Sequence, residues 1–144
     1  MNPSHDTPPR FADVLFAAAR IAAHARLTPV AQSRSLDAIS GAHLHFKCEQ
    51  LQRVGAFKFR GACNAVFALD PAGARRGVVT HSSGNHGAAL ALAAQLRGIS
   101  CHVVVPEGAV CSKLEAIEAG GALLHRCAAN LAAREAACAR VQAD

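Results

Sequence analysis

Residues 77–106 read GVVTHSSGNHGAALALAAQLRGISCHVVVP, and this stretch decides the fold. It opens with a short apolar run, passes through a loop of small and polar residues, and continues as an alanine- and leucine-rich segment. It ends in a second apolar run. Apolar runs without polar alternation are typical of strands covered on both faces, as in parallel sheets with crossover helices. The stretch therefore predicts a strand–helix–strand unit of an α/β protein.

The same alternation of helices and strands extends in both directions along the chain. The connections are short, as is usual between α/β units, and we therefore predict an α/β architecture with a doubly wound parallel sheet. The expected order is a helix from Phe11 to about Arg26, a strand at Leu44–Glu49, a helix near Phe57–Leu69, a strand at Gly77–His81, a helix at about Asn85–Arg97, a strand at Cys101–Val105, a helix at Ser112–Ala119, a strand at Ala122–Arg126 and a helix at roughly Leu131–Gln142.

Composition narrows the class of protein. A chain of 144 residues, 51% hydrophobic and 17% charged, is long enough and apolar enough for a domain with its own core. The net charge of +5 is not gathered into runs, and the chain has no Trp or Tyr. Nucleic-acid binding usually needs a basic stripe with aromatic residues between, so we expect no nucleic-acid partner. A mildly basic chain suits an anionic cofactor or substrate.

Cysteine usage and hydropathy indicate the compartment. The six cysteines form no Cys-x-x-Cys pair, which favours buried thiols in a reducing compartment over disulfides or zinc. The longest strictly apolar stretch, Ala88–Ala94, is too short to span a bilayer, and no signal-peptide core precedes Arg20. We therefore expect a cytoplasmic protein without a membrane partner. No cluster of His, Cys, Asp and Glu has metal-ligand spacing, so no metal is predicted.

Residues 55–61, GAFKFRG, open a predicted helix and contain Lys58. The residues on the same helical face as this lysine are apolar, which predicts that the face points at the sheet: Ala62, Ala65, Val66 and Leu69. Burial and the helix dipole would both disfavour the ammonium form there, and Schiff-base chemistry requires a neutral amine. The alternative is a lysine whose ammonium reaches solvent from the helix end.

The loop at residues 82–87, SSGNHG, joins a predicted strand to a predicted helix. This arrangement presents backbone N–H groups to an anion at the carboxyl edge of the sheet. Asn85 heads an apolar stripe of its helix, so we expect its amide to lie over that edge; the stripe consists of Ala88, Ala89, Leu92 and Leu96. The alternative is an ordinary capping loop, which Ser82 alone would favour. His86 is either a base or a solvated helix residue.

Taken together, GAFKFRGACNAV at 55–66 and THSSGNHG at 80–87 resemble the fold-type II pyridoxal-phosphate (PLP) enzymes, which have a tryptophan synthase β-like fold. The most similar branch contains the serine/threonine dehydratases, hydroxyaspartate dehydratases and serine racemases. The resemblance implies an incomplete fold, mainly the small domain. Residues 1–52 would join the large PLP domain, residues 53–144 would form the small α/β domain, and the C-terminal half of the large domain is absent.

The resemblance also implies PLP as the cofactor and a role for each site residue. Lys58 would form the Schiff base and later carry a proton, with Phe57 packed beside the cofactor ring. Asn85 would hydrogen-bond the pyridine 3′-oxygen. The substrate carboxylate pocket would be lined by Ser82, Ser83, Asn85 and His86. Ser83, like its counterpart in racemase-like members, would exchange a proton opposite the lysine, so the two implied catalytic residues are Lys58 and Ser83.

The implied activity is that of a PLP-dependent ammonia-lyase, which converts a 3-hydroxy amino acid of the serine or threonine type to a 2-oxo acid and ammonia. Serine racemisation is the alternative, because both reactions share an intermediate. Family members are about twice as long, and their phosphate-gripping glycine-rich loop lies in the missing half. Two further hypotheses are a truncated, non-catalytic module and a phosphate-binding module without a Schiff base. We expect a homo-oligomer at full length, or a second chain that supplies the phosphate loop.

Overall fold

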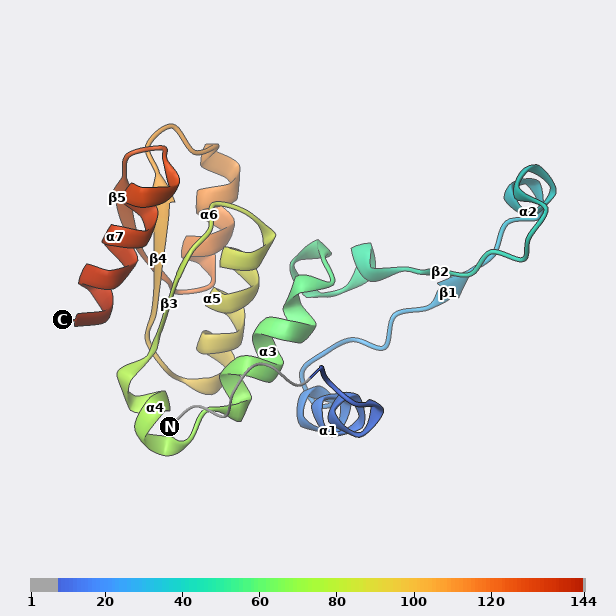
Figure 1. Cartoon of the computed structure of the whole chain (residues 1–144), viewed down its shortest axis with the longest axis horizontal. Coiled ribbons are helices and arrows are strands. Elements are labelled where there is room, and N and C mark those ends of the chain that lie inside the picture. The colour runs from blue at the N-terminus through green and yellow to red at the C-terminus, as the bar shows by residue number, and fades with distance from the viewer. Residues whose placement is uncertain (1–7, 144) are drawn as a thin grey trace.

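A parallel sheet lies at the centre of the computed structural model, which describes residues 8–143 (Figure 1). Within these residues its strands are β3 (Val78–His81), β4 (Cys101–Pro106) and β5 (Leu123–Cys127), in the order β3-β4-β5. The side chains of Val103, Val104 and Val105 in the central strand are completely buried. A run of apolar residues is the expected sequence for a strand that is covered on both faces.

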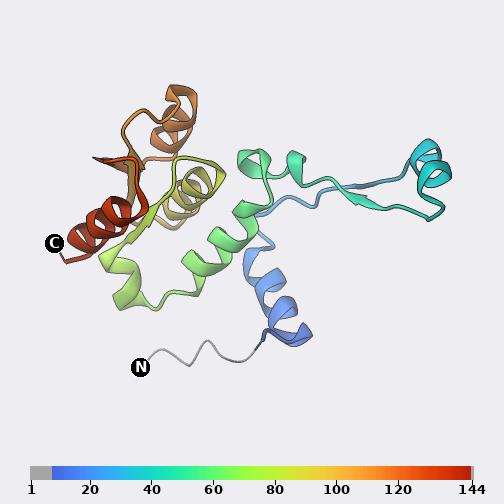
Figure 2. The same cartoon turned by 45° about the horizontal axis from the view of Figure 1, so that its top comes forward.

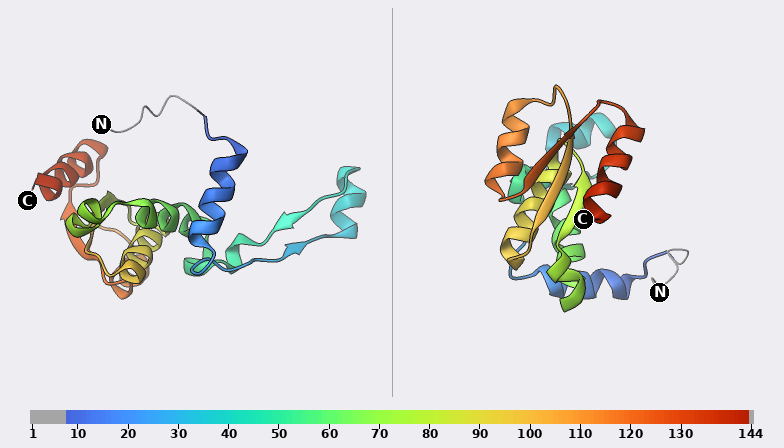
Figure 3. Two further views of the ribbon diagram at one scale, coloured as in Figure 1. Left: turned by 90° about the horizontal axis from the view of Figure 1, so that it is seen from below. Right: turned by 90° about the vertical axis from the view of Figure 1, so that its left-hand side faces the viewer.

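Helices cover both faces of this sheet. The crossover helices α5 (Asn85–Arg97) and α6 (Cys111–Ala119) lie on one face, and α7 (Leu131–Ala143) lies on the other (Figure 3, right). Consecutive parallel strands joined by right-handed crossovers place their helices on the same side, as seen for α5 and α6. The predicted doubly wound α/β architecture is confirmed.

The helix α3 (Lys58–Ala68) packs against α5 and α1 (Phe11–Ile21), and not against the sheet as its apolar stripe predicted. Its buried residues are Phe59, Ala62, Cys63 and Val66, whereas Ala65 is exposed. Ala62 and Val66 of the predicted stripe are buried, so the buried face is turned by less than one residue position (~100°) from the face that Lys58 shares. The prediction that Lys58 heads the buried face was wrong, because α3 finds its partner in another helix.

Packing against several neighbours also determines which residues of α5 are buried. Seven of its residues between Gly87 and Ala94 are buried, whereas Leu96, expected in the apolar stripe, is exposed. The helix is enclosed by the sheet, α3 and α6, so small residues are needed nearly all round. A Cβ on Gly87 would lie 2.5 Å from the carbonyl oxygen of Ser82 and 3.0 Å from Ile117. The single predicted stripe is thus only partly correct.

Residues 27–48 form an arm that extends away from the sheet (Figures 1 and 2). In this arm the antiparallel pair β1 (Val30–Ala31) and β2 (Phe46–Lys47) leads to α2 (Arg34–Ser40) at the tip. The strand expected at Leu44–Glu49 is only two residues long. The first helix also ends at Ile21, earlier than the predicted Arg26, and a turn follows it.

Several short elements were not predicted. The helix α4 (Pro71–Arg76) begins after Asp70, whose side chain accepts a hydrogen bond from the Gly73 N–H, and Ser33 caps α2 in the same way. Two 3₁₀ turns, η1 (Glu49–Leu51) and η2 (Arg53–Gly55), precede α3. From α3 onward, every predicted helix and strand begins and ends within one residue of its expected limits.

Candidate functional site

The loop after β3 is fastened to the sheet and to α5 by Ser82. Its N–H donates to the carbonyl oxygen of Val104 at 3.1 Å. Its Oγ accepts hydrogen bonds from the N–H groups of Gly84 at 3.4 Å and Gly87 at 3.2 Å. The capping interpretation is therefore confirmed for Ser82. Because a hydroxyl that accepts two bonds still carries its own proton, Ser82 can also donate to an anion.

The first turn of α5 presents further donors at the carboxyl edge of the sheet. Asn85 and His86 are exposed, and N–H groups in a first helical turn have no carbonyl partner inside the helix. The helix dipole adds partial positive charge at this end. A Cβ built on Gly84 would meet nothing within 4 Å, so the backbone is open to close approach. This turn can therefore receive a phosphate or a carboxylate.

Lys58 lies at the beginning of α3, and its side chain is exposed. Its Nζ lies 4.9 Å from the ring centroid of Phe57, which is itself exposed. The burial expected for this lysine is not seen, and the alternative of an ammonium that reaches solvent describes it. An accessible amine beside an accessible aromatic ring leaves room for a flat ligand against both.

The two segments act on one another through His86. Partial burial of its imidazole lowers the pKa of His86, and the positive charge of Lys58 and then His81 lower it further. Part of the imidazole is desolvated in this way although residue 86 as a whole is exposed. The lowered pKa favours the neutral form of the His86 imidazole. Among the described residues, no hydrogen bond joins Lys58 to the loop, so the charge of Lys58 acts on His86 through space.

Sequence reasoning missed a cluster behind the lysine. Arg60 makes a two-pronged ion pair with Glu49, with Nε–Oε2 and Nη2–Oε1 distances of 2.8 and 2.7 Å. The hydroxyl of Thr28 donates to the same carboxylate at 2.5 Å. The Arg60 hydrogen bond, with smaller help from Thr28, lowers the pKa of Glu49 to about 2 against the opposing effect of burial. The sequence held only a weak sign of this cluster, namely that the acidic residue Glu49 ends the strand expected at Leu44–Glu49.

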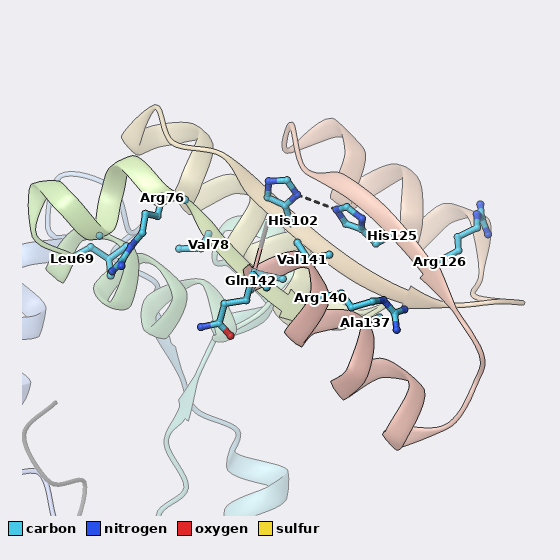
Figure 4. Close-up of a pocket in the computed structure, with 14 residues that line it drawn as sticks. Leu69, Arg76, Val78, His102, His125, Arg126, Ala137, Arg140, Val141 and Gln142 are labelled. Carbon is cyan, nitrogen blue, oxygen red and sulfur yellow. Dashed lines mark hydrogen bonds between the residues drawn. The ribbon is translucent and has the colours of Figure 1, made fainter. Parts of the chain in front are cut away.

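A separate cavity lies on the α7 side of the sheet (Figure 4). It is lined near the amino ends of the strands by Val78, His102 and His125, and by arginines such as Arg76 and Arg140. The His102 Nδ1 and His125 Nε2 atoms are 3.0 Å apart. None of the predicted site residues lines this cavity. The predicted site and this cavity are thus at different ends of the sheet.

Residues 8–143 contain neither a cluster of metal ligands nor a helix that could span a membrane. No group of three or more His, Cys, Asp or Glu side chains in this part of the chain could hold a metal ion. None of the helices found there is both long and apolar enough to cross a membrane.

An accessible lysine beside an anion-accepting helix terminus, at the carboxyl edge of a doubly wound sheet, defines an α/β protein suited to an anionic carbonyl ligand. A family model described as "Pyridoxal-phosphate dependent enzyme" matches residues 21–144, and the chain belongs to this family. The predicted resemblance is confirmed, and so is PLP as the cofactor that the family uses.

Two relatives and one solved structure indicate the branch. The chain is 48% identical to a beta-hydroxyaspartate dehydratase of Paracoccus denitrificans over 94% of its length and 43% of the relative. It is 50% identical to a serine racemase of Dictyostelium discoideum over 85% of its length and 38% of the relative. The structure of maize serine racemase superposes with a TM-score of 0.87 at 50% identity, and covers 90% of this chain and 40% of that one.

These matches have two consequences. They confirm a PLP enzyme of the racemase and dehydratase group, but the relatives differ in activity. The chain also spans only 38–43% of the length of the relatives that it matches. The reaction, the substrate and the role of each site residue therefore belong to the proposal that follows.

Proposed function

We propose that this chain supplies the lysine half of a PLP-dependent active site that converts a 3-hydroxy amino acid to a 2-oxo acid and ammonia. The observation that carries the proposal is the packing of α3, which begins with the exposed Lys58, against α5. It brings an accessible amine to the same edge of the sheet as the anion-accepting first turn of α5. A 3-hydroxy amino acid presents the two groups that such a site needs, a carboxylate and an α-proton.

The residues present fit the cofactor. The aldehyde of PLP needs an accessible amine, and Lys58 is exposed. The exposed Phe57 ring offers a flat apolar surface, and the exposed amide of Asn85 offers a donor for the pyridine oxygen. When bound, PLP supplies the electron sink that stabilises negative charge at the α-carbon of the substrate.

The proposed roles of the side chains concern protons and the substrate carboxylate. The Nζ of Lys58 would remove the α-proton and pass a proton to the β-hydroxyl, which leaves as water; hydrolysis of the product then gives the 2-oxo acid and ammonia. The carboxylate is held by the hydroxyls of Ser82 and Ser83 together with the N–H groups of Asn85 and His86. Because its lowered pKa favours the neutral form, the His86 imidazole can accept a proton or a hydrogen bond beside this carboxylate.

Racemisation is the second candidate. It is favoured by the two serine racemases among the relatives and solved structures described above. In this reaction Ser83 Oγ would return a proton to the face of the α-carbon opposite Lys58. The variant Ser83→Ala separates the candidates, because it removes racemisation and leaves elimination in place.

We also propose that residues 1–52 join a larger PLP domain and that residues 53–144 form the small domain; residues 1–7 and 144 lie outside the described part. Two observations support this division. The arm exposes Leu27 and Ile39 by 96% and 82%, and the relatives are more than twice as long as this chain. The complete protein would be a cytoplasmic homo-oligomer, or would use a second chain that supplies the phosphate loop.

A chimera tests the function. Residues 1–144 would be joined to the C-terminal part of the Paracoccus relative, and release of ammonia and 2-oxo acid would be measured with serine, threonine and 3-hydroxyaspartate. We expect turnover of at least one substrate, and none by the matched Lys58→Ala chimera. The isolated chain should bind PLP weakly and turn over no serine. Equal activity of the chimera with and without Lys58 would contradict the proposal.

A further inference from the structure

The Glu49 carboxylate ties together three segments that are far apart in the sequence. It accepts two hydrogen bonds from Arg60 at the start of α3 and one from Thr28 at the base of the arm. Thr28 is buried, and Lys47 donates to its carbonyl oxygen at 2.6 Å. A two-pronged guanidinium–carboxylate pair fixes orientation as well as distance. The first turn of α3 is thus oriented relative to the arm.

A second set of bonds holds the chain just before the lysine. Gln52 is only 2% exposed, and its Nε2 donates to the carbonyl oxygen of Arg26 at 2.9 Å. Its Oε1 accepts from the N–H groups of Arg26 and Arg53 at 2.9 and 3.0 Å. Arg60 Nη2 also donates to the Arg26 carbonyl at 3.1 Å. The same stretch of backbone therefore anchors residues on both sides of Lys58.

The backbone between these anchors is strained. Val54 has a φ of 56°, in the left-handed region that a β-branched residue rarely adopts, and Gly55 follows with a φ of 65°. Such a conformation persists only where the surroundings enforce it, and it is concentrated at functional sites. Here the bonds of Gln52 on one side and Arg60 on the other enforce the turn that leads into Lys58.

We propose that Glu49 and Arg60 are positioning residues for Lys58. Two residues along a helix correspond to a rotation of about 200°, so Arg60 and Lys58 point to nearly opposite sides of the first turn. With Arg60 held toward the arm, Lys58 is directed toward the loop at residues 82–86. This inference rests on the proposed function only in naming PLP as the ligand of the amine.

The alternative is a pair that merely stabilises the fold. Exposed ion pairs contribute little to global stability, and both partners here keep some solvent contact. A positioning role predicts a local effect on α3 and on the reactivity of Lys58, whereas a stabilising role predicts a uniform effect. Measurements on the intact chain can therefore distinguish the positioning role from the stabilising role.

The test uses Glu49→Gln and Arg60→Gln, with Arg20→Gln as the matched control. Arg20 also loses a positive charge and a contact with α3, but its partner is Asn64, well beyond the first turn. Amide hydrogen exchange is measured without cofactor for residues 57–62 and for α7. Reactivity is measured by adding PLP and cyanoborohydride and determining by mass spectrometry the label on Lys58 relative to Lys113.

We expect both network variants to exchange about tenfold faster at residues 57–62, with α7 unchanged. The ratio of label on Lys58 to label on Lys113 should fall about threefold. Arg20→Gln should change neither quantity. Arg60→Lys should show a smaller loss than Arg60→Gln, because lysine keeps the positive charge but cannot make the two-pronged hydrogen bond. Unchanged exchange at residues 57–62, or equal acceleration throughout the chain, would overturn the proposal.

One result would separate this inference from the proposed function. If the unaltered chain carries equal label on Lys58 and Lys113, the proposed PLP site fails. Exchange at residues 57–62, which needs no cofactor, then decides the positioning role alone.

Discussion

The sheet region (residues 53–143) and the arm (residues 27–48) bury their apolar side chains to very different degrees. In the sheet region, Val103, Val104 and Val105 are completely buried between helices. In the arm, Leu27 and Ile39 are almost fully exposed. A short two-stranded ribbon is marginally stable in water unless it packs against something else. The contrast indicates that the sheet region supplies its own stability, whereas the arm needs a neighbour.

The proposed active site lies at the junction of these two regions. Lys58 opens the first helix of the sheet region, and Arg60 in the same turn holds the base of the arm through Glu49. Under the proposed positioning role, a movement of the base of the arm would change the direction of Lys58. The following predictions test the contrast, beginning with the largest expected effect.

The backbone packs closely against Gly87 in the sheet region. The substitution Gly87→Ala should lower the free energy of unfolding by about 3 kcal/mol, because the new Cβ meets the backbone of Ser82. Urea unfolding followed by circular dichroism measures this. Gly84→Ala is the matched control, since its Cβ meets open space. Equal destabilisation by both variants would show that the described packing is not the cause.

A pair of truncations compares the two regions directly. Val104→Ala should cost about 2 kcal/mol, because it leaves a cavity in the central strand. Ile39→Ala in the arm should change the free energy of unfolding by less than about 0.5 kcal/mol. The same unfolding experiment serves for both. A large loss of unfolding free energy in Ile39→Ala would mean that the arm is packed in solution, and would contradict the difference between the two regions.

The cap at the start of α5 should have a smaller effect. Ser82→Ala removes the acceptor for the Gly84 and Gly87 N–H groups and should cost about 1 kcal/mol. Ser83→Ala should be nearly neutral for stability, although it is the variant expected to abolish racemisation. Thermal unfolding of the two variants side by side provides the comparison; a greater loss in Ser83→Ala would contradict the capping role.

A further small effect is predicted for the pH dependence of stability. The folded-state pKa of Glu49, about 2, lies below its ordinary value of 4.5. The pair therefore contributes stability above pH 4.5, and this contribution is lost as the pH falls toward 2. Because the pair keeps solvent contact, the loss should be about 0.5 kcal/mol. Urea unfolding of the chain and of Glu49→Gln from pH 5 to 2.5 measures it; parallel curves would refute the assignment.

The sequence predicted elements well where local signals agreed. The helix at Asn85–Arg97 was predicted at its observed limits, because Gly84 and Gly98 flank a continuous run of helix-forming residues. The short helices α2 and α4 escaped prediction although Ser33 and Asp70 cap them, because neither has an apolar stripe long enough to stand out.

Other features depend on tertiary packing and could not be predicted. The buried face of α3 was misassigned because helical periodicity identifies an apolar stripe but does not say whether a sheet or a helix covers it. Thr28, Glu49 and Arg60 share no periodicity, so their cluster forms only when the chain folds. The pairing of Lys58 with the loop at residues 82–86 came from the resemblance of two motifs, and spacing alone would have favoured an ordinary surface lysine.

The central claim is that Lys58 is the lysine that binds PLP, and selective labelling of this residue tests it most directly. The intact chain would be treated with PLP and cyanoborohydride at pH 7.5, and each lysine would be quantified by peptide mapping. The account predicts that Lys58 carries several times more label than either Lys47 or Lys113, and that free phosphate reduces the excess. Equal labelling of all these lysines would contradict the account.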